Sequence, residues 1–410
     1  MLVGPAIIMK LVVAVIVIAS IVASSDSPVQ VHVALGSNPG TITFTWNTRY
    51  TTPTTYVRIA SGSSWLYYQG TFRSFKDSSN SWIIHSVTVQ LNPDTRYQYQ
   101  VGCQVNGFSS SLSLLVPSDQ APANFLLFGD LSTAQDGADS WTDMNDNAKD
   151  YLIQAMIHVG DLAYDLSSKS STVGDDFMAT IQPTAHYVPY MICAGNHEAS
   201  DNYYNYLQRF DMPNNKFYYT FTIGYVRFLA IHTEAFLSET DMLPTMMSYI
   251  KSVLNRNDED KAAYPWLIVF GHRPMYCSSK AKADACGPEA DVLKQYLEPL
   301  FTIYGVDLYI NGHVHNYQRT APVYQGIVTS GSAYGDVYMY PKSPIYITTG
   351  GPGSDDTNSK IDWTDAPDWL IAGEEDFTFS ILNVYNQTHL YWEQQKTKNN
   401  KITDAFWVVK

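Results

Sequence analysis

Basic residues are scarce in this chain. Of its 410 residues, 25 are Lys or Arg and 39 are Asp or Glu, which gives a formal net charge of −14 at pH 7. Such a chain repels phosphate backbones and anionic lipid surfaces, so the composition argues against binding of nucleic acid or membranes by charge. It also provides no diffuse attraction for phosphate esters. Any affinity for phosphorylated compounds must therefore come from a local cationic site.

Cysteine is also scarce. Four cysteines are few for a chain of this length to depend on a framework of disulfides. Cys277 and Cys286 are close together in a polar loop, and we predict a local bridge between them. Cys193 lies inside an apolar run and is predicted to be a free thiol in the core, whereas Cys103 has no evident partner.

Long hydrophobic runs are absent after the N-terminus. Residues 1–24 carry Lys10, then the run LVVAVIVIASIVA, and close on small residues, which is the layout of a cleaved signal peptide. An uncleaved anchor is the alternative, because the run is near the short limit for spanning a bilayer. We predict a protein that is secreted to the extracellular space or a lysosome-like compartment, without stable membrane insertion. The sequon Asn386-Gln387-Thr388 predicts glycosylation of Asn386.

The rest of the chain divides into two parts. Residues 28–117 contain alternating strands separated by turns, which predicts a β-sandwich, and they hold no cluster of titratable side chains. Residues 117–123 read as a linker. Residues 124–410 mix strands with helices predicted at 143–154, 202–210, 245–255 and 289–304, and they end in a strand-rich segment. The first part is predicted to be structural, which leaves the chemistry to the second.

In the second part, five apolar runs each end at a glycine that is followed by a side chain able to bind metal. Because ligands bind beyond the carboxyl ends of strands in α/β sheets, these ends can converge on one crevice. Tyr164 follows the second aspartate by three residues, so both oxygens can lie on one side of a turn. Carboxylate and phenolate suit a hard cation such as ferric iron. A helix cap or turn remains the alternative for any single residue. The runs lead to Asp130, Asp161, Asn196, His272, and the pair His313 and His315.

These motifs resemble the purple acid phosphatases of the metallophosphoesterase superfamily. The blocks GD-x-G, GD-x-x-Y, GNH-E/D, V-x-x-H and GH-x-H of that family occur here in order. The N-terminal part looks like the fibronectin-III-like β-sandwich of the larger plant and animal members. The resemblance implies an α/β (α+β) fold, with a metallophosphoesterase β-sheet sandwich flanked by helices over residues 124–410. The blocks stand as Gly129-Asp130-Leu131-Ser132, Gly160-Asp161-Leu162-Ala163-Tyr164, Gly195-Asn196-His197-Glu198, Val269-Phe270-Gly271-His272 and Gly312-His313-Val314-His315.

The resemblance implies two metal sites that share one bridging ligand. Asp130, Tyr164 and His315 would hold ferric iron. Asn196, His272 and His313 would hold a divalent zinc, iron or manganese ion, and Asp161 would bridge the two. The donor types agree, since phenolate and carboxylate favour the ferric ion, whereas an amide oxygen with two imidazoles suits a divalent ion.

Two departures from related patterns refine this interpretation. Protein serine/threonine phosphatases and nucleases of the superfamily place a histidine two residues after the first aspartate. Here that position is Ser132, where purple acid phosphatases usually have glycine. Plant members carry a pair of histidines after the V-x-x-H block, and residues 278–287 contain none.

The function implied by the resemblance is acid phosphatase activity on small phosphate monoesters. Both ions would clamp the phosphate while a metal-bound hydroxide attacks phosphorus in line with the leaving group. His197 has no predicted metal and is the candidate proton donor, with an orienting role as the alternative. A phosphodiesterase or pyrophosphatase could use the same ligands, and a non-catalytic surface binding protein could keep the fold. The oligomeric state stays open, a homodimer included.

Four further residues are candidates for supporting roles. Asp165 and Glu198 are predicted to orient ligands or cap turns. Arg273 either contacts phosphate or anchors the loop of His272, and His232 is predicted to lie in the core or behind the ligands rather than to bind metal.

Overall fold

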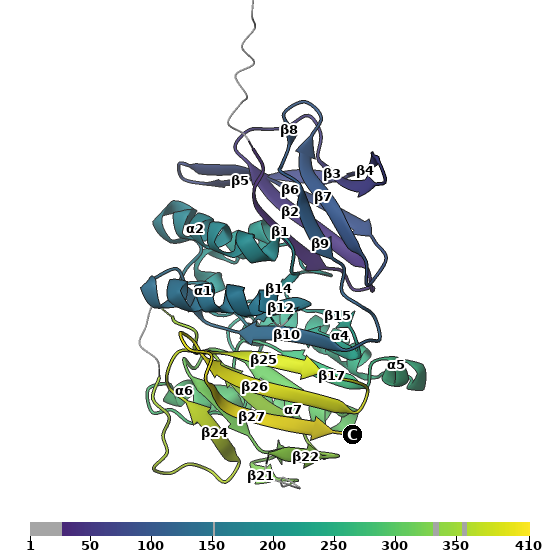
Figure 1. The fold of residues 1–410 in the computed structure, drawn as a ribbon. Coiled ribbons are helices and arrows are strands. Elements are labelled where there is room, and N and C mark those ends of the chain that lie inside the picture. The colour runs from purple at the N-terminus through teal and green to yellow at the C-terminus, as the bar shows by residue number, and fades with distance from the viewer. Residues whose placement is uncertain (1–26, 151, 331–335, 355–358) are drawn as a thin grey trace, which may run out of the picture.

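The computed structural model describes residues 27–150, 152–330, 336–354 and 359–410 (Figure 1). The predicted signal peptide, residues 1–24, lies outside the described residues. Within the part of the chain that is described, no helix is both long enough and apolar enough to cross a bilayer.

The N-terminal part is a sandwich of two antiparallel sheets, as predicted (Figure 1). Its core is formed by inward-facing side chains such as Phe44, Trp46 and Tyr99, which are fully buried. The sequence prediction missed β4 and β5, which pair with β3 and β6 in different sheets. Most side chains of β4 are exposed and show no alternation. One sheet has the order β1 (Val29–Leu35), β2 (Thr41–Thr48), β6 (Asn80–Gln90), β5 (Thr71–Asp77). The other has β4 (Ser64–Gln69), β3 (Tyr56–Ser61), β7 (Arg96–Cys103), with β8 (Gly107–Phe108) and β9 (Leu112–Leu115) both paired to β7.

The C-terminal part is built on two larger mixed sheets that pack face to face. Phe125 of one sheet lies 4.9 Å from Phe228 of the other, measured between ring centroids, and one hydrophobic core joins both. The first sheet has the order β14 (Tyr190–Ile192), β12 (Ala155–His158), β10 (Ala123–Phe128), β25 (Thr378–Val384), β26 (His389–Lys396), β27 (Ile402–Val409), β22 (Val337–Met339). The second has β15 (Tyr219–Ile223), β16 (Val226–Ala230), β17 (Trp266–Phe270), β18 (Leu308–Asn311), β23 (Ile345–Thr349), β19 (Tyr317–Thr320), β24 (Leu370–Glu374).

Helices flank these sheets, and α2 also lies against the sandwich (Figure 1). The helices are α1 (Gln135–Asp150), α2 (Ser168–Ala185), α3 (Tyr204–Arg209), α4 (Leu243–Leu254), α5 (Asp258–Ala263), α6 (Ala283–Cys286) and α7 (Pro288–Tyr304). Short 3-10 turns occupy His197–Asp201, Thr233–Phe236 and Thr240–Met242. Small paired strands are β11 (Leu131–Ser132) with β13 (Leu162–Ala163), and β20 (Val323–Tyr324) with β21 (Ile327–Val328).

The predicted helices agree with α3, α4 and α7, but the start of α1 was placed too late, and α2, α5 and α6 were not predicted. The structure begins α1 at Gln135, eight residues before the predicted start at 143. The sequence prediction missed α2 altogether. The first residues of α2 are rich in serine, and Lys169, Ser170 and Ser171 have positive φ, so the sequence shows no apolar stripe at its start.

A buried ion pair fastens the sandwich to the C-terminal part. The Arg209 side chain on α3 is 1% exposed and pairs with Asp175 on α2 at 2.8 Å. Two sandwich residues donate to the same carboxylate: Trp82 Nε1 at 2.8 Å and Asn80 Nδ2 at 2.9 Å. Asp175 therefore neutralises a buried guanidinium and also holds the two parts together.

Replacing Asp175 with Ala is expected to lower the free energy of unfolding by about 3–5 kcal/mol, because it leaves the buried Arg209 cation without a partner. Urea unfolding measures the change. The matched control is Asp176→Ala on the same helix, where the side chain is exposed and a change within about 0.5 kcal/mol is expected. Equal losses in the two variants would show that the ion pair contributes no stability.

Candidate functional site

The five strand ends singled out in the sequence do converge, but from two sheets. β10, β12 and β14 run parallel in the first sheet, and β17 and β18 run parallel in the second. Their carboxyl ends meet at a junction where backbone groups of different motifs form hydrogen bonds with one another. Asp130 N donates to Gly160 O at 3.0 Å, and Gly312 N donates to His272 O at 3.0 Å. The crevice therefore lies between the edges of two facing sheets.

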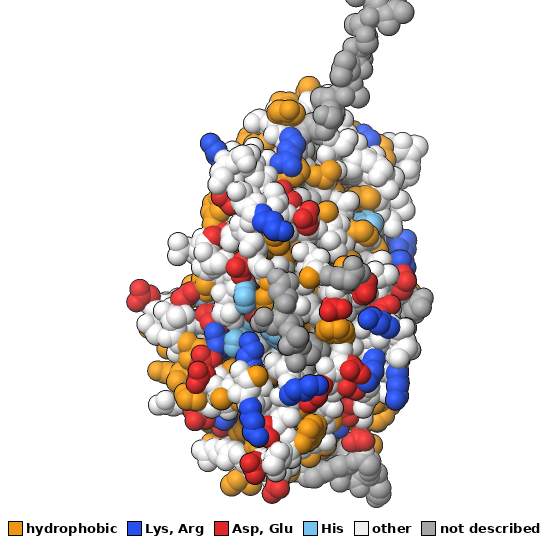
Figure 2. Space-filling model, turned by 90° about the vertical axis from the view of Figure 1, so that its left-hand side faces the viewer, with side chains coloured by type: hydrophobic (Ala, Val, Ile, Leu, Met, Phe, Trp, Pro, Cys, Tyr) orange, Lys and Arg blue, Asp and Glu red, His pale blue; other side chains and the backbone are white. Residues whose placement is uncertain are grey.

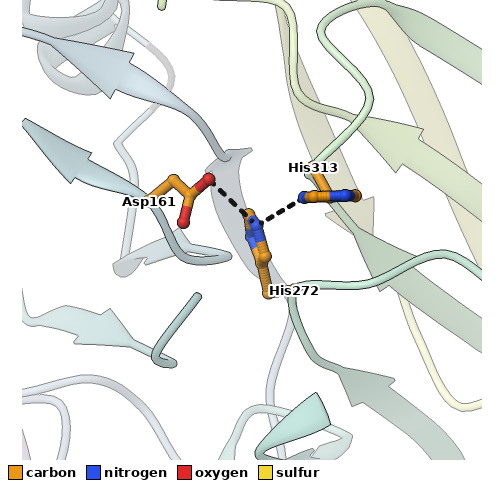
Figure 3. A group of neighbouring side chains, drawn as sticks. All are labelled: Asp161, His272 and His313. Carbon is orange, nitrogen blue, oxygen red and sulfur yellow. Dashed lines mark hydrogen bonds and ion pairs between the residues drawn. The ribbon is translucent and has the colours of Figure 1, made fainter. Parts of the chain in front are cut away.

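One group of side chains at this junction contains Asp161, Asn196, His272 and His313. Ligand atoms of Asp161, His272 and His313 all lie within 4.8 Å of one another, and all three residues are buried. Figure 3 shows these three side chains pointing toward one another from three different loops. His272 Nε2 lies at the centre, 3.1 Å from Asp161 Oδ2, 3.1 Å from Asn196 Oδ1 and 3.2 Å from His313 Nδ1. Two imidazoles, one carboxylate and one amide oxygen form a donor set that fits a divalent ion.

A second group lies beside the first and contains Asp130, Tyr164 and His315. The Tyr164 hydroxyl is 3.1 Å from Asp130 Oδ1 and 3.1 Å from His315 Nε2, and these last two atoms are 3.5 Å apart. The backbone N–H of His313 donates to Asp130 Oδ2 at 2.8 Å, which connects the two groups. Phenol, carboxylate and imidazole here fit a hard trivalent ion.

Burial and charge tune both groups. Burial acts to lower the pKa of His272, but the Asp161 carboxylate outweighs burial and raises this pKa to about 10. Burial of the Asp161 carboxylate acts to raise its pKa. The charge of His272 outweighs burial and holds the pKa of Asp161 below its ordinary value. Burial, together with the charge of Asp130, raises the pKa of Tyr164 well above its usual range. A cation bound here would have to displace the protons of His272 and Tyr164, so metal affinity should fall as the pH falls.

The glycines of the motifs leave room for the neighbouring carboxylates. A Cβ on Gly312 would lie 2.2 Å from Asp130 Oδ2, and a Cβ on Gly195 would lie 2.2 Å from Asp161 Oδ1. Asp130, Asp161 and His313 themselves adopt positive φ, at 60°, 54° and 67°. Unfavourable backbone conformations of this kind persist only where the surrounding structure enforces them, and they are common at functional sites.

Replacing Gly312 with Ala is expected to weaken metal binding by about 10- to 100-fold, because the new methyl group displaces the Asp130 carboxylate. Metal titration followed by elemental analysis measures this loss. Gly62→Ala is the control, because a Cβ there meets no atom within 4 Å, although Gly62 has positive φ, at 61°, which Gly312 does not. If both variants bind metal like the unaltered chain, Gly312 does not protect the carboxylate.

Comparisons with known proteins agree with this geometry. Residues 28–114 match the model of the purple acid phosphatase N-terminal domain, residues 123–317 that of calcineurin-like phosphoesterases, and residues 343–405 that of the iron/zinc purple acid phosphatase-like protein C. The Homo sapiens protein named acid phosphatase type 7 is 32% identical over 95% of this chain and 93% of its own length. The chain belongs to the purple acid phosphatase family. The predicted family, fold class and assignment as an acid phosphatase are thereby confirmed, and family membership implies a binuclear metal centre.

Other members of the purple acid phosphatase family resemble the chain over most of its length. Purple acid phosphatase 18 from Arabidopsis thaliana is 28% identical over 94% of this chain and 85% of that protein. A probable inactive purple acid phosphatase 1 from the same plant is 28% identical over 94% of this chain and 70% of that protein. Among solved structures, the yellow lupin purple acid phosphatase superposes with a TM-score of 0.81 at 23% identity, covering 94% of this chain and 74% of that one.

Glu198 ties two motifs of this purple acid phosphatase together. Its buried carboxylate accepts backbone N–H bonds from Asp161 at 3.0 Å, Leu162 at 2.7 Å and Gly195 at 2.7 Å. Burial, together with the charge of Asp161, raises the pKa of Glu198 to about 8. Glu198 therefore fixes the backbone that presents Asp161, which agrees with its predicted orienting role.

His197 lies at the edge of the site, where its side chain is 35% exposed. Its Nδ1 bonds to Asp165 Oδ1 at 2.6 Å, and its Nε2 is 3.9 Å from Asp161 Oδ2. Its ring also packs on Tyr164, with centroids 4.5 Å apart. Burial acts to lower the pKa of His197, but the charges of Asp161 and Asp165 outweigh burial. They raise this pKa and favour the protonated ring. Asp165 thus orients His197, which has no predicted metal.

Arg273 is held by carboxylates that the sequence did not indicate. Its guanidinium bonds to both oxygens of Glu234, at 2.8 and 2.9 Å, and to Glu289. The Arg273 Nη1 atom also lies 3.1 Å from His313 Nε2. A bond there requires Nε2 to accept, which puts the ring proton on Nδ1. An ion bound at Nδ1 requires the opposite tautomer, so metal binding and this Arg273 contact exclude each other.

Several supporting residues have no motif of their own. The Ser354 hydroxyl contacts His315 Nδ1 at 2.8 Å, and the Val159 carbonyl contacts His272 Nδ1 at 2.9 Å, so that Nε2 of each ring faces the site. Only the GGPG sequence just before Ser354 could have pointed to it.

His232 bonds to Glu239 at 3.1 Å and to none of the predicted ligands. Ser132 is buried, and its hydroxyl accepts from Ala134 N at 3.0 Å.

The structure contains the predicted bridge between Cys277 and Cys286. It encloses the loop that follows His272 and ends in α6. Cys103 and Cys193 are buried free thiols, as the sequence indicated for Cys193.

Proposed function

We propose that this chain is a secreted acid phosphatase that hydrolyses phosphate monoesters at an Fe(III)–M(II) centre. The observation that carries the proposal is the convergence of every predicted ligand into two adjoining groups. Asp130, Tyr164 and His315 would hold the ferric ion. Asn196, His272 and His313 would hold a zinc, ferrous or manganese ion, with Asp161 between the two ions.

Bound ions would supply the positive charge that neutralises the phosphate, and they would lower the pKa of the attacking water. The chain's own residues do the rest. Glu198 holds the Asp161 backbone in place, and Ser354 holds the His315 ring. His197, oriented by Asp165, is placed to give a proton to the leaving alkoxide.

Secretion is supported by the apolar N-terminal segment and by the Cys277–Cys286 bridge, since disulfides persist in oxidising compartments. Asn386 is exposed in the turn between β25 and β26, where a glycan can be attached. The domain limits 28–117 and 124–410, and a homodimer, stay predictions.

The alternatives predict different activities. A relative from Hordeum vulgare, 27% identical over 71% of this chain, is named nucleotide pyrophosphatase/phosphodiesterase, so the same site could cleave diesters or pyrophosphates. A non-catalytic binding protein is the other alternative, since one relative is called probably inactive. The complete set of donors supports catalysis, because a site that has lost its catalytic activity usually also lacks one of its metal ligands.

Hydrolysis of phenyl phosphate and of bis(4-nitrophenyl) phosphate at acidic pH separates these functions. We expect the monoester to be the better substrate, activity to vanish on chelation, and activity to return with iron plus a divalent ion. Faster hydrolysis of the diester would replace the proposal with a phosphodiesterase. No hydrolysis of either ester by the metal-loaded protein would favour the binding protein.

Tyr164→Phe tests the assignment of the ferric ion. The variant is expected to lose the broad visible absorption that a tyrosinate gives to ferric iron, while keeping Asp130 and His315 as donors. Absorption spectra and iron content are measured together. Tyr190→Phe is the control, since Tyr190 is also buried but bonds to His158 away from the ligands. An unchanged spectrum in Tyr164→Phe would assign the iron to other donors.

A further inference from the structure

A cavity of about 370 Å³ adjoins the proposed metal centre on the side of the disulfide-bridged loop. His313 belongs to both the cavity and the proposed metal ligands. Figure 2 shows histidine side chains reaching the surface on this face of the molecule, with basic side chains next to them. The charged and titratable residues that line the cavity are Arg273, Lys280, Lys282, Asp284, Glu289 and His313.

The positive charges in this cavity differ in how far they are neutralised. Arg273 is matched by two carboxylates, Glu234 and Glu289. Lys280 is exposed and pairs with Asp362 at 3.3 Å. Lys282, half-buried, has no hydrogen bond or ion pair from its side chain to any residue that the structure describes. It is therefore the cation in the cavity that is available to a ligand.

Lys282 lines the same cavity as His313, one of the proposed metal ligands. A substrate that fills this cavity can therefore reach both side chains. Asp284, exposed at the same rim, carries the opposing charge.

The loop that carries Lys282 is braced at both ends. Cys277 and Cys286 close it covalently, with their Cα atoms 5.1 Å apart. Ser278 N donates to Gln318 Oε1 at 2.7 Å, and the Ser278 hydroxyl donates to the Asp362 carbonyl at 2.9 Å. A side chain on such a loop loses less conformational freedom on binding, which favours recognition.

We propose that Lys282 binds a second anionic group of the substrate, next to the phosphate held at the metal centre. The preferred substrates would then carry a phosphate on the leaving group, as nucleoside diphosphates do. This inference rests on the proposed function, since it assumes that the first phosphate binds at the centre. Hydrolysis of such a substrate transfers the terminal phosphoryl group to water and releases the remaining phosphate ester with its oxygen protonated.

Adenosine diphosphate and adenosine monophosphate form a matched pair of probes, because only the first has a phosphate on its leaving group. In the metal-loaded full chain, Lys282→Ala is expected to lower the ratio of kcat/KM for the diphosphate to that for the monophosphate by about tenfold, the effect of one charge-assisted hydrogen bond. Asp284→Asn should raise the ratio about two- to threefold, since it removes the opposing charge. Lys251→Ala, an exposed cation on α4, should leave the ratio unchanged.

Binding provides a second readout that does not need turnover. Calorimetry with methylenediphosphonate and methylphosphonate should show Lys282→Ala weakening the first ligand about tenfold more than the second. An unaltered ratio in both Lys282→Ala measurements, or an equal loss in Lys251→Ala, would overturn the proposal. If the unaltered protein hydrolyses neither nucleotide and also leaves phenyl phosphate intact, the proposed function fails, and the calorimetric comparison still decides whether Lys282 binds the second group.

Discussion

Replacing Asp161 with Asn is expected to lower kcat by about 10³-fold and to reduce metal content in parallel. Asp161 lies between the two groups of proposed ligands, and a metal ion contributes several kcal/mol to transition-state stabilisation. The fold should survive, because the amide oxygen can still accept the backbone N–H of His197, which donates to Asp161 Oδ1 at 3.0 Å. Elemental analysis and turnover on phenyl phosphate are measured on the same preparation.

Asp260→Asn is the matched control for this change. Asp260 is a partly buried carboxylate on α5 that pairs with Arg227 and contacts none of the proposed ligands. Its variant should keep both metals and full turnover. If Asp161→Asn retained two metals and normal turnover, Asp161 would not bridge them, and the assignment of both groups would have to be revised.

His197→Ala is expected to leave metal content nearly unchanged and to slow alkyl phosphates by about 10²–10⁴-fold, the range typical of a lost general acid. Aryl phosphates should slow much less, because phenolates leave without a proton. The structure favours this role, since Asp165 orients the ring and its Nε2 faces the site edge 3.9 Å from Asp161. Steady-state rates on ethyl phosphate and 4-nitrophenyl phosphate give the comparison.

Asp165→Asn separates orientation from proton donation. It removes the charge that holds Nδ1 of His197 but keeps the ring, so it should reproduce the dependence on the leaving group in a weaker form. Equal slowing of both substrates in His197→Ala, with metals retained, would assign His197 to phosphate binding or orientation. Loss of metal in that variant would make its role structural.

The grouping of the proposed ligands was predictable from the sequence because each of these residues stands in a local pattern. A buried strand, a glycine and a donor occupy a few consecutive residues, and a Cβ on Gly195 or Gly312 would collide with a carboxylate of another motif. The partition of the strands between two sheets was not predictable. Pairing of β10 with β25, or contact of His313 with Asp130 across 183 residues, leaves no trace in either local stretch.

The supporting residues were missed for the same reason. Arg273 was recognised as a candidate, but its partner Glu234 is 39 residues away and carries no motif. Helix α2 was missed because its serine-rich start has no apolar periodicity, although it carries the Asp175 that fastens the sandwich. Such residues are chosen by packing and charge in the folded chain, which a single sequence does not display.

Elemental analysis combined with a visible absorption spectrum of the purified protein tests the central claim most directly. The account predicts about two metal ions per chain, at least one of them iron, and a broad visible band that depends on Tyr164. A colourless, iron-free protein with full phosphatase activity would contradict the account and would indicate a centre built on divalent ions alone.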